Sequence, residues 1–261
     1  MRVALGIEYD GRRYCGWQSQ PGGCGVQDTL ERALTAICGE FVRVAAAGRT
    51  DTGVHATAQV AHFDAPVERP LSAWVRGVNS ALGDAAAVLW AQPVASSFHA
   101  RFSATGRAYT YLLLNRAARP GLEAGRVGWF HRTLTVERMQ VAGRLLLGVH
   151  DFSAFRAAEC QAESAVRELR RLDIERHGEL IVMRFAANAF LQRMVRNIVG
   201  SLVYVGKDRY PPQWMGELLA GRDRSAAAPT FAPDGLYLTA VEYDSAWGLP
   251  QPCARAPLIM A

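Results

Sequence analysis

The order of apolar segments in the first hundred residues constrains the fold of this chain more than any other feature. Alternation with a period of two predicts strands over residues 3–10, 41–44, 58–63 and 86–94. A helical period predicts one helix from Val26 that stops at Gly39 and another near residues 71–82. This strand-helix-strand-strand-helix-strand order packs naturally as helices on one face of an antiparallel sheet, which is a ferredoxin-like arrangement.

The rest of the chain resembles a diverged second copy of the same α/β unit, with insertions. Its predicted strands are residues 108–114, 166–176, 180–186 and 236–243, and its predicted helices are residues 136–147, 191–205 and 214–219. We therefore expect an α+β fold of two ferredoxin-like (RRM-like) halves, residues 1–100 and 101–247, followed by a poorly ordered tail, residues 248–261.

Charge and composition favour a folded protein with a polyanionic partner. The formal net charge is +5 and the isoelectric point is near 9.1, which suits phosphate neutralisation. Lys207 is the only lysine, and the arginine bias is equally compatible with genome composition. No apolar run approaches the roughly 18 residues of a membrane span. The N-terminal segment has the pattern of a strand and not that of a secretory signal. We expect a cytoplasmic protein without membrane contact.

Cysteines and histidines give no sign of a disulfide framework or a metal site. The cysteines are odd in number and scattered, at Cys15, Cys24, Cys38, Cys160 and Cys253. Free thiols in a reducing compartment fit this pattern best. The histidines lack metal-ligand spacing, and no glycine-rich phosphate loop follows a strand. The sequence thus predicts no metal and no nucleotide cofactor.

A polar turn at residues 48–56 is the strongest candidate for a catalytic site. It reads Gly-Arg-Thr-Asp-Thr-Gly-Val-His-Ala between two strand-like runs, so it places Asp51 and Arg49 at the exposed end of a sheet. A nearby arginine favours the ionised form of a carboxylate. By itself, however, a glycine-flanked aspartate is more often an Asx turn.

Other candidates are ambiguous from spacing alone. Arg12 and Arg13 follow the first strand and are able to meet phosphates, although a structural turn is the alternative. Tyr109, on a predicted strand, suits either a core position or a platform for an unstacked base. Arg196 lies on the polar side of a predicted helix, where a solvated ion pair is the more common role.

Taken together, the motifs resemble the TruA-type tRNA pseudouridine synthases. Residues 48–56 look like the signature Gly-Arg-Thr-Asp-x-Gly-Val-His-Ala of that family. Similar stretches follow the family's order at residues 9–18, 98–109, 150–155, 190–200 and 235–238. The resemblance covers nearly the full chain and implies conversion of uridine to pseudouridine in the anticodon stem-loop of tRNA.

The resemblance also implies roles for individual residues. Asp51 would be the catalytic aspartate, Tyr109 the aromatic residue against the target base, and Arg49 a residue that engages the flipped nucleotide. Arg196 would be the ion-pair partner of the aspartate, and His55 a possible RNA contact. Family members act without a cofactor, as homodimers that bind tRNA in a basic cleft, and the two halves are expected to join into one extended sheet.

Two departures and two alternatives accompany this interpretation. Before Gly235 the family usually has Thr-Ala-Pro, whereas this chain has Thr-Phe-Ala-Pro at residues 230–233, and the tail after Trp247 matches nothing in the family. A non-catalytic RNA-binding protein on the same scaffold is the main alternative. A hydrolase that uses Asp51 and His55 is the other, although these two residues lack further ligands or a base.

Overall fold

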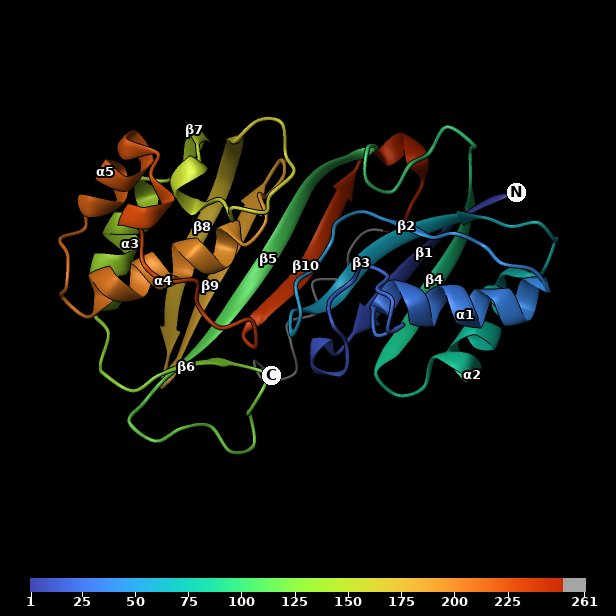
Figure 1. Cartoon of the computed structure of the whole chain (residues 1–261), viewed down its shortest axis with the longest axis horizontal. Coiled ribbons are helices and arrows are strands. Elements are labelled where there is room, and N and C mark those ends of the chain that lie inside the picture. The colour runs from blue at the N-terminus through green and yellow to red at the C-terminus, as the bar shows by residue number, and fades with distance from the viewer. Residues whose placement is uncertain (251–261) are drawn as a thin grey trace. The chain divides into compact units, whose positions relative to one another are not determined.

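A computed structural model of the chain describes residues 1–250, and Figure 1 shows the course of the chain. By its internal contacts the chain forms two compact units. Unit 1 comprises residues 1–105 together with the chain from residue 237, and unit 2 comprises residues 106–236. This division differs from the predicted halves because the strand at residues 236–243 returns to the first half. The predicted tail lies almost wholly outside the described residues.

Unit 1 combines a mostly antiparallel sheet with two helices. Its elements are β1 (Arg2–Tyr9), α1 (Val26–Cys38), β2 (Ala45–Ala46), β3 (His55–Asp64), α2 (Val78–Leu82), β4 (Ala86–Val94) and β10 (Leu236–Tyr243). Antiparallel pairing joins β1 to both β3 and β4, and β2 to β3. The last strand, β10, pairs in parallel with the start of β3, with Tyr237 opposite His55.

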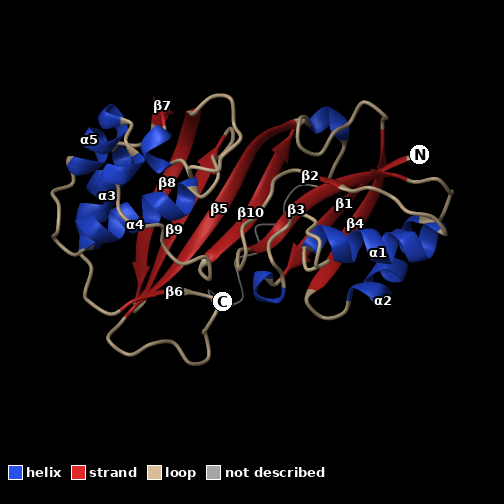
Figure 2. Cartoon of the chain, in the orientation of Figure 1, coloured by secondary structure: helices blue, strands red, loops and turns tan. Residues whose placement is uncertain are grey.

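Unit 2 is also a mixed α/β unit (Figure 2). Its elements are β5 (Ala104–Asn115), β6 (Gly128–Phe130), α3 (Val136–Arg144), β7 (Gly148–Asp151), β8 (Val166–His177), β9 (Leu180–Ala187), α4 (Met194–Gly206) and α5 (Trp214–Gly221). Antiparallel pairs link β5 to β9, β9 to β8 and β8 to β7, whereas β6 runs parallel to β5. Gly143 of α3 approaches Leu172 and Ile174 of β8, so α3 packs on that strand.

Most predicted elements are confirmed, and their ends have local causes. Helix α1 begins after Gly25, whose N–H donates to the Asp28 carboxylate at 2.9 Å, so this donor is satisfied by a capping interaction. It ends at Gly39, where φ is 80° and the N–H donates to the Thr35 carbonyl. Strands β4 and β10 have the predicted bounds.

The predicted strand at residues 41–44 is wrong. Val42 and Val44 are buried and Phe41 is exposed, so the alternation is real. The Val44 N–H, however, donates to the buried Glu31 carboxylate of α1 at 2.9 Å instead of to a neighbouring strand.

The predicted helix at residues 71–82 is a π-helical turn, Ala73–Gly77, followed by α2, and the short strands β6 and β7 were not predicted.

The expectation of free cysteines is also wrong for two of them. Cys15 and Cys24 form a disulfide with their Cα atoms 5.4 Å apart. The Cys15 N–H donates to the Cys24 carbonyl at 3.0 Å, so the backbone loop itself brings the two residues together, which spacing alone did not reveal. Cys38 and Cys160 are buried free thiols, and Cys253 lies outside the described residues.

Asn197, a polar residue of α4, is completely buried. Its Nδ2 donates to the Phe155 carbonyl at 2.8 Å, and its Oδ1 accepts from Thr230 at 2.7 Å and from Arg224 at 3.1 Å. This one side chain therefore fastens the loop before β10 to the helix.

We expect Asn197→Ala to lower the free energy of unfolding by about 3 kcal/mol, because the buried Phe155 carbonyl loses its partner and the half-buried Thr230 and Arg224 side chains each lose one hydrogen bond. Urea unfolding followed by circular dichroism measures the change. Gln192→Ala, at an exposed position, is the matched control and should change stability by less than about 0.5 kcal/mol. Equal stability of the two variants would contradict the role of Asn197.

His62, in the core of unit 1, makes stability depend on pH. Its Nδ1 accepts the Ala100 N–H at 3.1 Å, which requires an unprotonated Nδ1. Burial, with smaller contributions from His99 and Arg2, lowers the pKa of His62 to about 4. The unfolded chain, with a pKa near 6.5, therefore binds this proton first, and stability falls as the pH drops from about 6.5 to 4.

We expect the wild type to lose roughly 2 kcal/mol more stability than His62→Gln between pH 7 and pH 4. Urea titrations at several pH values measure the difference. His131→Gln, at an exposed histidine, should retain the wild-type dependence on pH. A His62→Gln profile parallel to that of the wild type would contradict the assignment.

Candidate active site

The loop predicted to be catalytic, residues 48–54, lies between β2 and β3 of unit 1. For this prediction we call it the catalytic loop. Asp51 is half-buried and Thr52 is exposed. The turn closes where the Val54 N–H donates to the Asp51 carbonyl at 3.1 Å, and Gly53 adopts a φ of 81° that favours glycine. The sequence therefore presents the carboxylate on a tight turn at the start of β3.

Two buried side chains hold the residues on either side of Arg49. The Tyr9 hydroxyl is hydrogen-bonded to the Thr50 hydroxyl at 2.8 Å, and the Gln59 Nε2 donates to the Gly48 carbonyl at 2.8 Å. Burial raises the pKa of Tyr9 to about 12, so the phenol stays neutral at ordinary pH. These fixed contacts restrict the positions of Arg49 and of the residues that follow it.

Two glycines allow the loop after β1 to lie directly against the catalytic loop. A Cβ atom on Gly11 would stand 2.2 Å from the Val54 carbonyl oxygen, and one on Gly16 would stand 2.7 Å from the Thr50 oxygen. The Trp17 N–H also donates to the Thr50 carbonyl at 3.0 Å. The catalytic loop is thus supported by backbone contact that tolerates no side chain at these positions.

The three possible RNA contacts of unit 1 differ in exposure. Arg13 is exposed. Arg12 binds the Asp10 carboxylate through its Nε at 2.9 Å, and this arginine is the main reason that the pKa of Asp10 falls to about 2. His55 is only 3% exposed, accepts the Gly11 N–H at 3.1 Å and stacks on Tyr237. His55 thus has fixed neighbours within unit 1, and its contact with RNA stays a prediction.

Tyr109 and Arg196 belong to unit 2. Tyr109 is a half-buried residue of β5, and its ring meets Phe190 edge-on at a centroid distance of 5.1 Å. Arg196, on α4, donates from Nε to the Phe231 carbonyl at 2.8 Å, and the Phe231 N–H donates back to the Arg196 carbonyl at 3.2 Å. Arg196 therefore has a fixed backbone partner in the loop before β10.

The structure thus places the predicted residues in two sets. Arg49 and Asp51 share one loop of unit 1, whereas Tyr109 and Arg196 are held by separate neighbours within unit 2. An ion pair between Asp51 and Arg196, which the resemblance implies, requires the two units to meet there and stays a prediction.

The loop that departs from the family pattern is well supported in unit 2. The Tyr111 hydroxyl donates to the Ala232 carbonyl at 2.8 Å, and the Tyr111 ring lies 5.9 Å from that of Phe231. A Cβ on Gly200 would come within 2.3 Å of the Pro229 oxygen. The extra residue is therefore accommodated by packing against β5 and α4.

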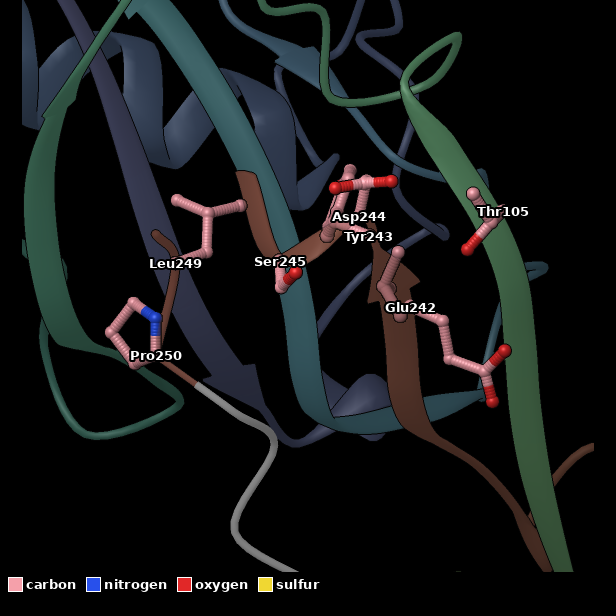
Figure 3. A pocket seen from close by; sticks show the side chains of 8 residues that line it. Thr105, Glu242, Tyr243, Asp244, Ser245, Leu249 and Pro250 are labelled. Carbon is pink, nitrogen blue, oxygen red and sulfur yellow. The ribbon is translucent and has the colours of Figure 1, made fainter. Parts of the chain in front are cut away.

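A cavity of about 400 Å³ in unit 1 lies apart from these residues, where β10 ends (Figure 3). It is lined by Thr105, Val241, Glu242, Tyr243, Asp244, Ser245, Leu249 and Pro250. None of the predicted site residues lines it.

Within residues 1–250, no three or more His, Cys, Asp or Glu side chains are grouped so as to hold a metal ion, and no helix there is long and apolar enough to cross a membrane.

The supporting residues of the catalytic loop were not predicted from the sequence. Tyr9 and Gln59 occupy inward positions on β1 and β3, where a pattern of alternation predicts ordinary core residues. The available signal was the polar character of Gln59, because a buried amide needs hydrogen-bond partners.

Comparisons with known proteins agree with this architecture. A family model described as "tRNA pseudouridine synthase" matches residues 6–103 and 142–244. A "tRNA pseudouridine synthase A" of Dechloromonas aromatica is 62% identical over 97% of this chain and 96% of its own length. The protein of that name from Nitrosomonas europaea is 56% identical over 96% of this chain and 92% of its length.

A solved structure titled "Crystal Structure of a Cbf5-Nop10-Gar1 Complex" matches with a TM-score of 0.36 and 11% identity, over 90% of this chain and 48% of that one. That similarity is too low to bear on function. The sequence relatives span nearly the whole chain, and the first segment of the family model, residues 6–103, includes residues 48–54. The chain belongs to the tRNA pseudouridine synthases, the isomerases that convert uridine to pseudouridine.

Proposed function

We propose that this chain isomerises uridine in the anticodon stem-loop of tRNA and that Asp51 supplies the catalytic carboxylate. Tyr109 lies against the target base, Arg49 engages the flipped nucleotide, and Arg196 pairs with Asp51. The observation that carries the proposal is the fixed catalytic loop, which is held by Tyr9, Gln59 and two close glycine contacts, in a chain of this family.

The reaction needs no electron or group carrier. The bond from uracil N1 to C1′ breaks, the base turns, C5 bonds to C1′, the C5 proton leaves and N1 takes up a proton. An ionised Asp51 serves in each of three routes: attack on C1′, addition to C6, or removal of a C2′ proton. The proposed pairing with Arg196 would hold the carboxylate in one orientation for any of these routes.

Extrusion of the target nucleotide costs a few kcal/mol. Contact with the Tyr109 ring offsets about 1–3 kcal/mol of this cost. Phe190 meets Tyr109 edge-on, which orients the ring, and the phenol is able to relay the C5 proton.

We further propose a cytoplasmic homodimer of ferredoxin-like halves that binds tRNA in a basic cleft, without a cofactor. Light scattering over a range of concentrations tests the dimer, and a constant monomer mass contradicts it.

The test of the function is product formation by the purified wild type. Transcribed tRNA labelled with tritium at C5 of uridine should release tritium to water, and pseudouridine should map to the anticodon stem-loop. A transcript in which cytidine replaces those uridines is the control and should release none. Binding of tRNA without release would support the non-catalytic alternative, and cleavage of the RNA chain would support a hydrolase.

A further inference from the structure

A group of cations and stacked aromatic rings lies where α4 ends in unit 2, and the proposed catalysis uses none of it. We call Tyr204, Lys207, Arg209, Tyr210 and Trp214 the cationic aromatic cluster. Tyr210 stacks on Trp214 with ring centroids 4.1 Å apart, and Tyr204 lies nearly parallel to both rings at 6.3 and 6.5 Å. Trp214 is buried, whereas both tyrosines are half-buried, so the stack extends from the core towards the surface.

Both cations of the cluster contact the Tyr204 ring. Lys207 Nζ is 3.9 Å from the ring centroid and Arg209 Cζ is 4.8 Å from it. These distances are within the range of cation-π attraction. The ring therefore holds an ammonium and a guanidinium close to each other without neutralising either charge.

The backbone fixes this geometry. Helix α4 (Figure 1) ends as the Lys207 N–H donates to the Val203 carbonyl at 3.0 Å. The chain then turns through Asp208, whose φ of 61° is left-handed, and the Arg209 N–H donates to the Tyr204 carbonyl at 3.0 Å. The turn folds Arg209 back beside Lys207, so the two cations are presented together by a defined helix end.

The local charge is positive. Burial lowers the pKa of Lys207, and repulsion from Arg209 and Arg132 adds to this effect. Asp208, the carboxylate in the same turn, pairs with Arg138 Nε at 2.8 Å. A bound anion would relieve the repulsion among the three cations.

We propose that the cationic aromatic cluster binds backbone phosphates of the RNA substrate, outside the nucleotide that reacts. Lys207 and Arg209 contact the phosphates, and the exposed parts of Tyr204 and Tyr210 pack against the adjoining nucleotide. Clustered cations beside aromatic faces suit RNA in particular, because phosphates and unstacked bases alternate along a strand. This inference rests on the proposed function in one respect, that the substrate is RNA.

The sequence permits a direct test, since Lys207 is the only lysine. In protein prepared with this sequence, reductive methylation with formaldehyde and a borohydride has two targets, the Met1 α-amine and the Lys207 ε-amine. We expect saturating tRNA to slow methylation of Lys207 at least about threefold and to leave that of Met1 unchanged. Peptide mass spectrometry measures both sites in one sample, so Met1 is the internal control. Equal labelling of Lys207 with and without tRNA would overturn the proposal.

Variants test the same surface by affinity. The double variant Lys207→Gln/Arg209→Gln should bind tRNA about 10-fold more weakly, and the dependence of log Kd on log salt should decrease by about two phosphate contacts. Lys207→Arg keeps the charge and should bind like the wild type. Arg144→Gln removes an exposed arginine at the C-terminal end of α3, outside the cluster. This control should bind tRNA like the wild type. Unchanged affinity and salt dependence in the double variant would contradict the proposal.

Other roles of the cluster give different results. Cations at the end of a helix also interact favourably with its dipole. If the cluster served stability alone, the double variant would have a lower Tm, and tRNA would not protect Lys207 of the wild type from methylation. That result would overturn the proposal. Protection that appears with rising protein concentration and no RNA would indicate self-association and overturn the RNA assignment.

Failure of this inference is distinct from failure of the proposed function. A wild type that releases tritium but leaves Lys207 unprotected contradicts only the inference. A wild type that protects Lys207 but makes no pseudouridine contradicts only the function. In the double variant, KM should rise with Kd while kcat stays within about twofold, because Lys207 and Arg209 lie outside the proposed chemistry.

Discussion

Asp51→Asn is expected to release tritium from C5-labelled tRNA at least about 1,000-fold more slowly than the wild type while it binds tRNA with similar affinity. An amide has nearly the same size as a carboxylate, so the catalytic loop and its contacts with Gly11 and Gly16 remain. It cannot attack C1′ or C6, or take up a proton, as the carboxylate does. Loss of a group that acts only in the chemical step lowers kcat with little change in substrate affinity.

Asp84→Asn is the matched control, because Asp84 is an exposed aspartate of unit 1 outside the catalytic loop. It should keep wild-type kcat and KM. Asp51→Glu retains the charge but moves it by one methylene, and we expect partial loss of kcat. Normal turnover by Asp51→Asn would end the proposed mechanism, whichever of the three routes applies.

Gly11→Ala should lower kcat about 100-fold, a larger loss than its fall in stability accounts for at a temperature where the variant stays folded. Gly11 has no left-handed φ, so its backbone conformation is open to alanine. The new methyl would stand 2.2 Å from the Val54 oxygen and 2.5 Å from the Val54 carbonyl carbon, and both are backbone atoms that cannot rotate away. The catalytic loop must shift, and a displacement near 1 Å at a reacting group costs about 100-fold in rate.

Gly22→Ala is the control for this prediction, because a Cβ there meets nothing within 4 Å. It should leave both kcat and Tm unchanged. The measurement pairs single-turnover tritium release with thermal unfolding for each variant. Full activity in Gly11→Ala would show that the contact with Val54 does not position the loop for catalysis. A matching loss of Tm and activity would instead assign Gly11 to folding.

The strong periodic segments were predictable because each depends on its own residues. The apolar face of α1 and the alternation of β10 specify elements with little help from distant parts of the chain. Residues 41–44 show the limit of this reasoning. Their alternation is present, but the Val44 N–H donates its hydrogen bond to the buried Glu31 carboxylate and not to a strand. A pattern in one segment does not reveal which partner its backbone donors will find.

The same limit applies to the candidate site. The motif at residues 48–56 indicated Asp51 and Arg49 in one turn; the structure has both in one loop, but the turn itself runs from Asp51 to Val54 and leaves Arg49 just before it. The support from Tyr9, Gln59 and Gly11 was not predicted, because it depends on how β1 and β3 pair. The helical period likewise does not reveal that Asn197 is buried and accepts a hydrogen bond from Thr230, 33 residues downstream. A periodic pattern in one segment does not reveal its hydrogen bonds with segments that are distant in sequence.

The return of β10 to unit 1 has a consequence for synthesis on the ribosome. One edge of β3 stays unpaired at His55 and Ala56 until Tyr237 and Leu238 emerge, after all of unit 2 has been translated. Nascent chains that stop before residue 236 therefore hold an open strand edge beside the catalytic loop, a site for binding by chaperones. The isomerase can mature only late in translation, so a partial chain gains no activity while it is still being made.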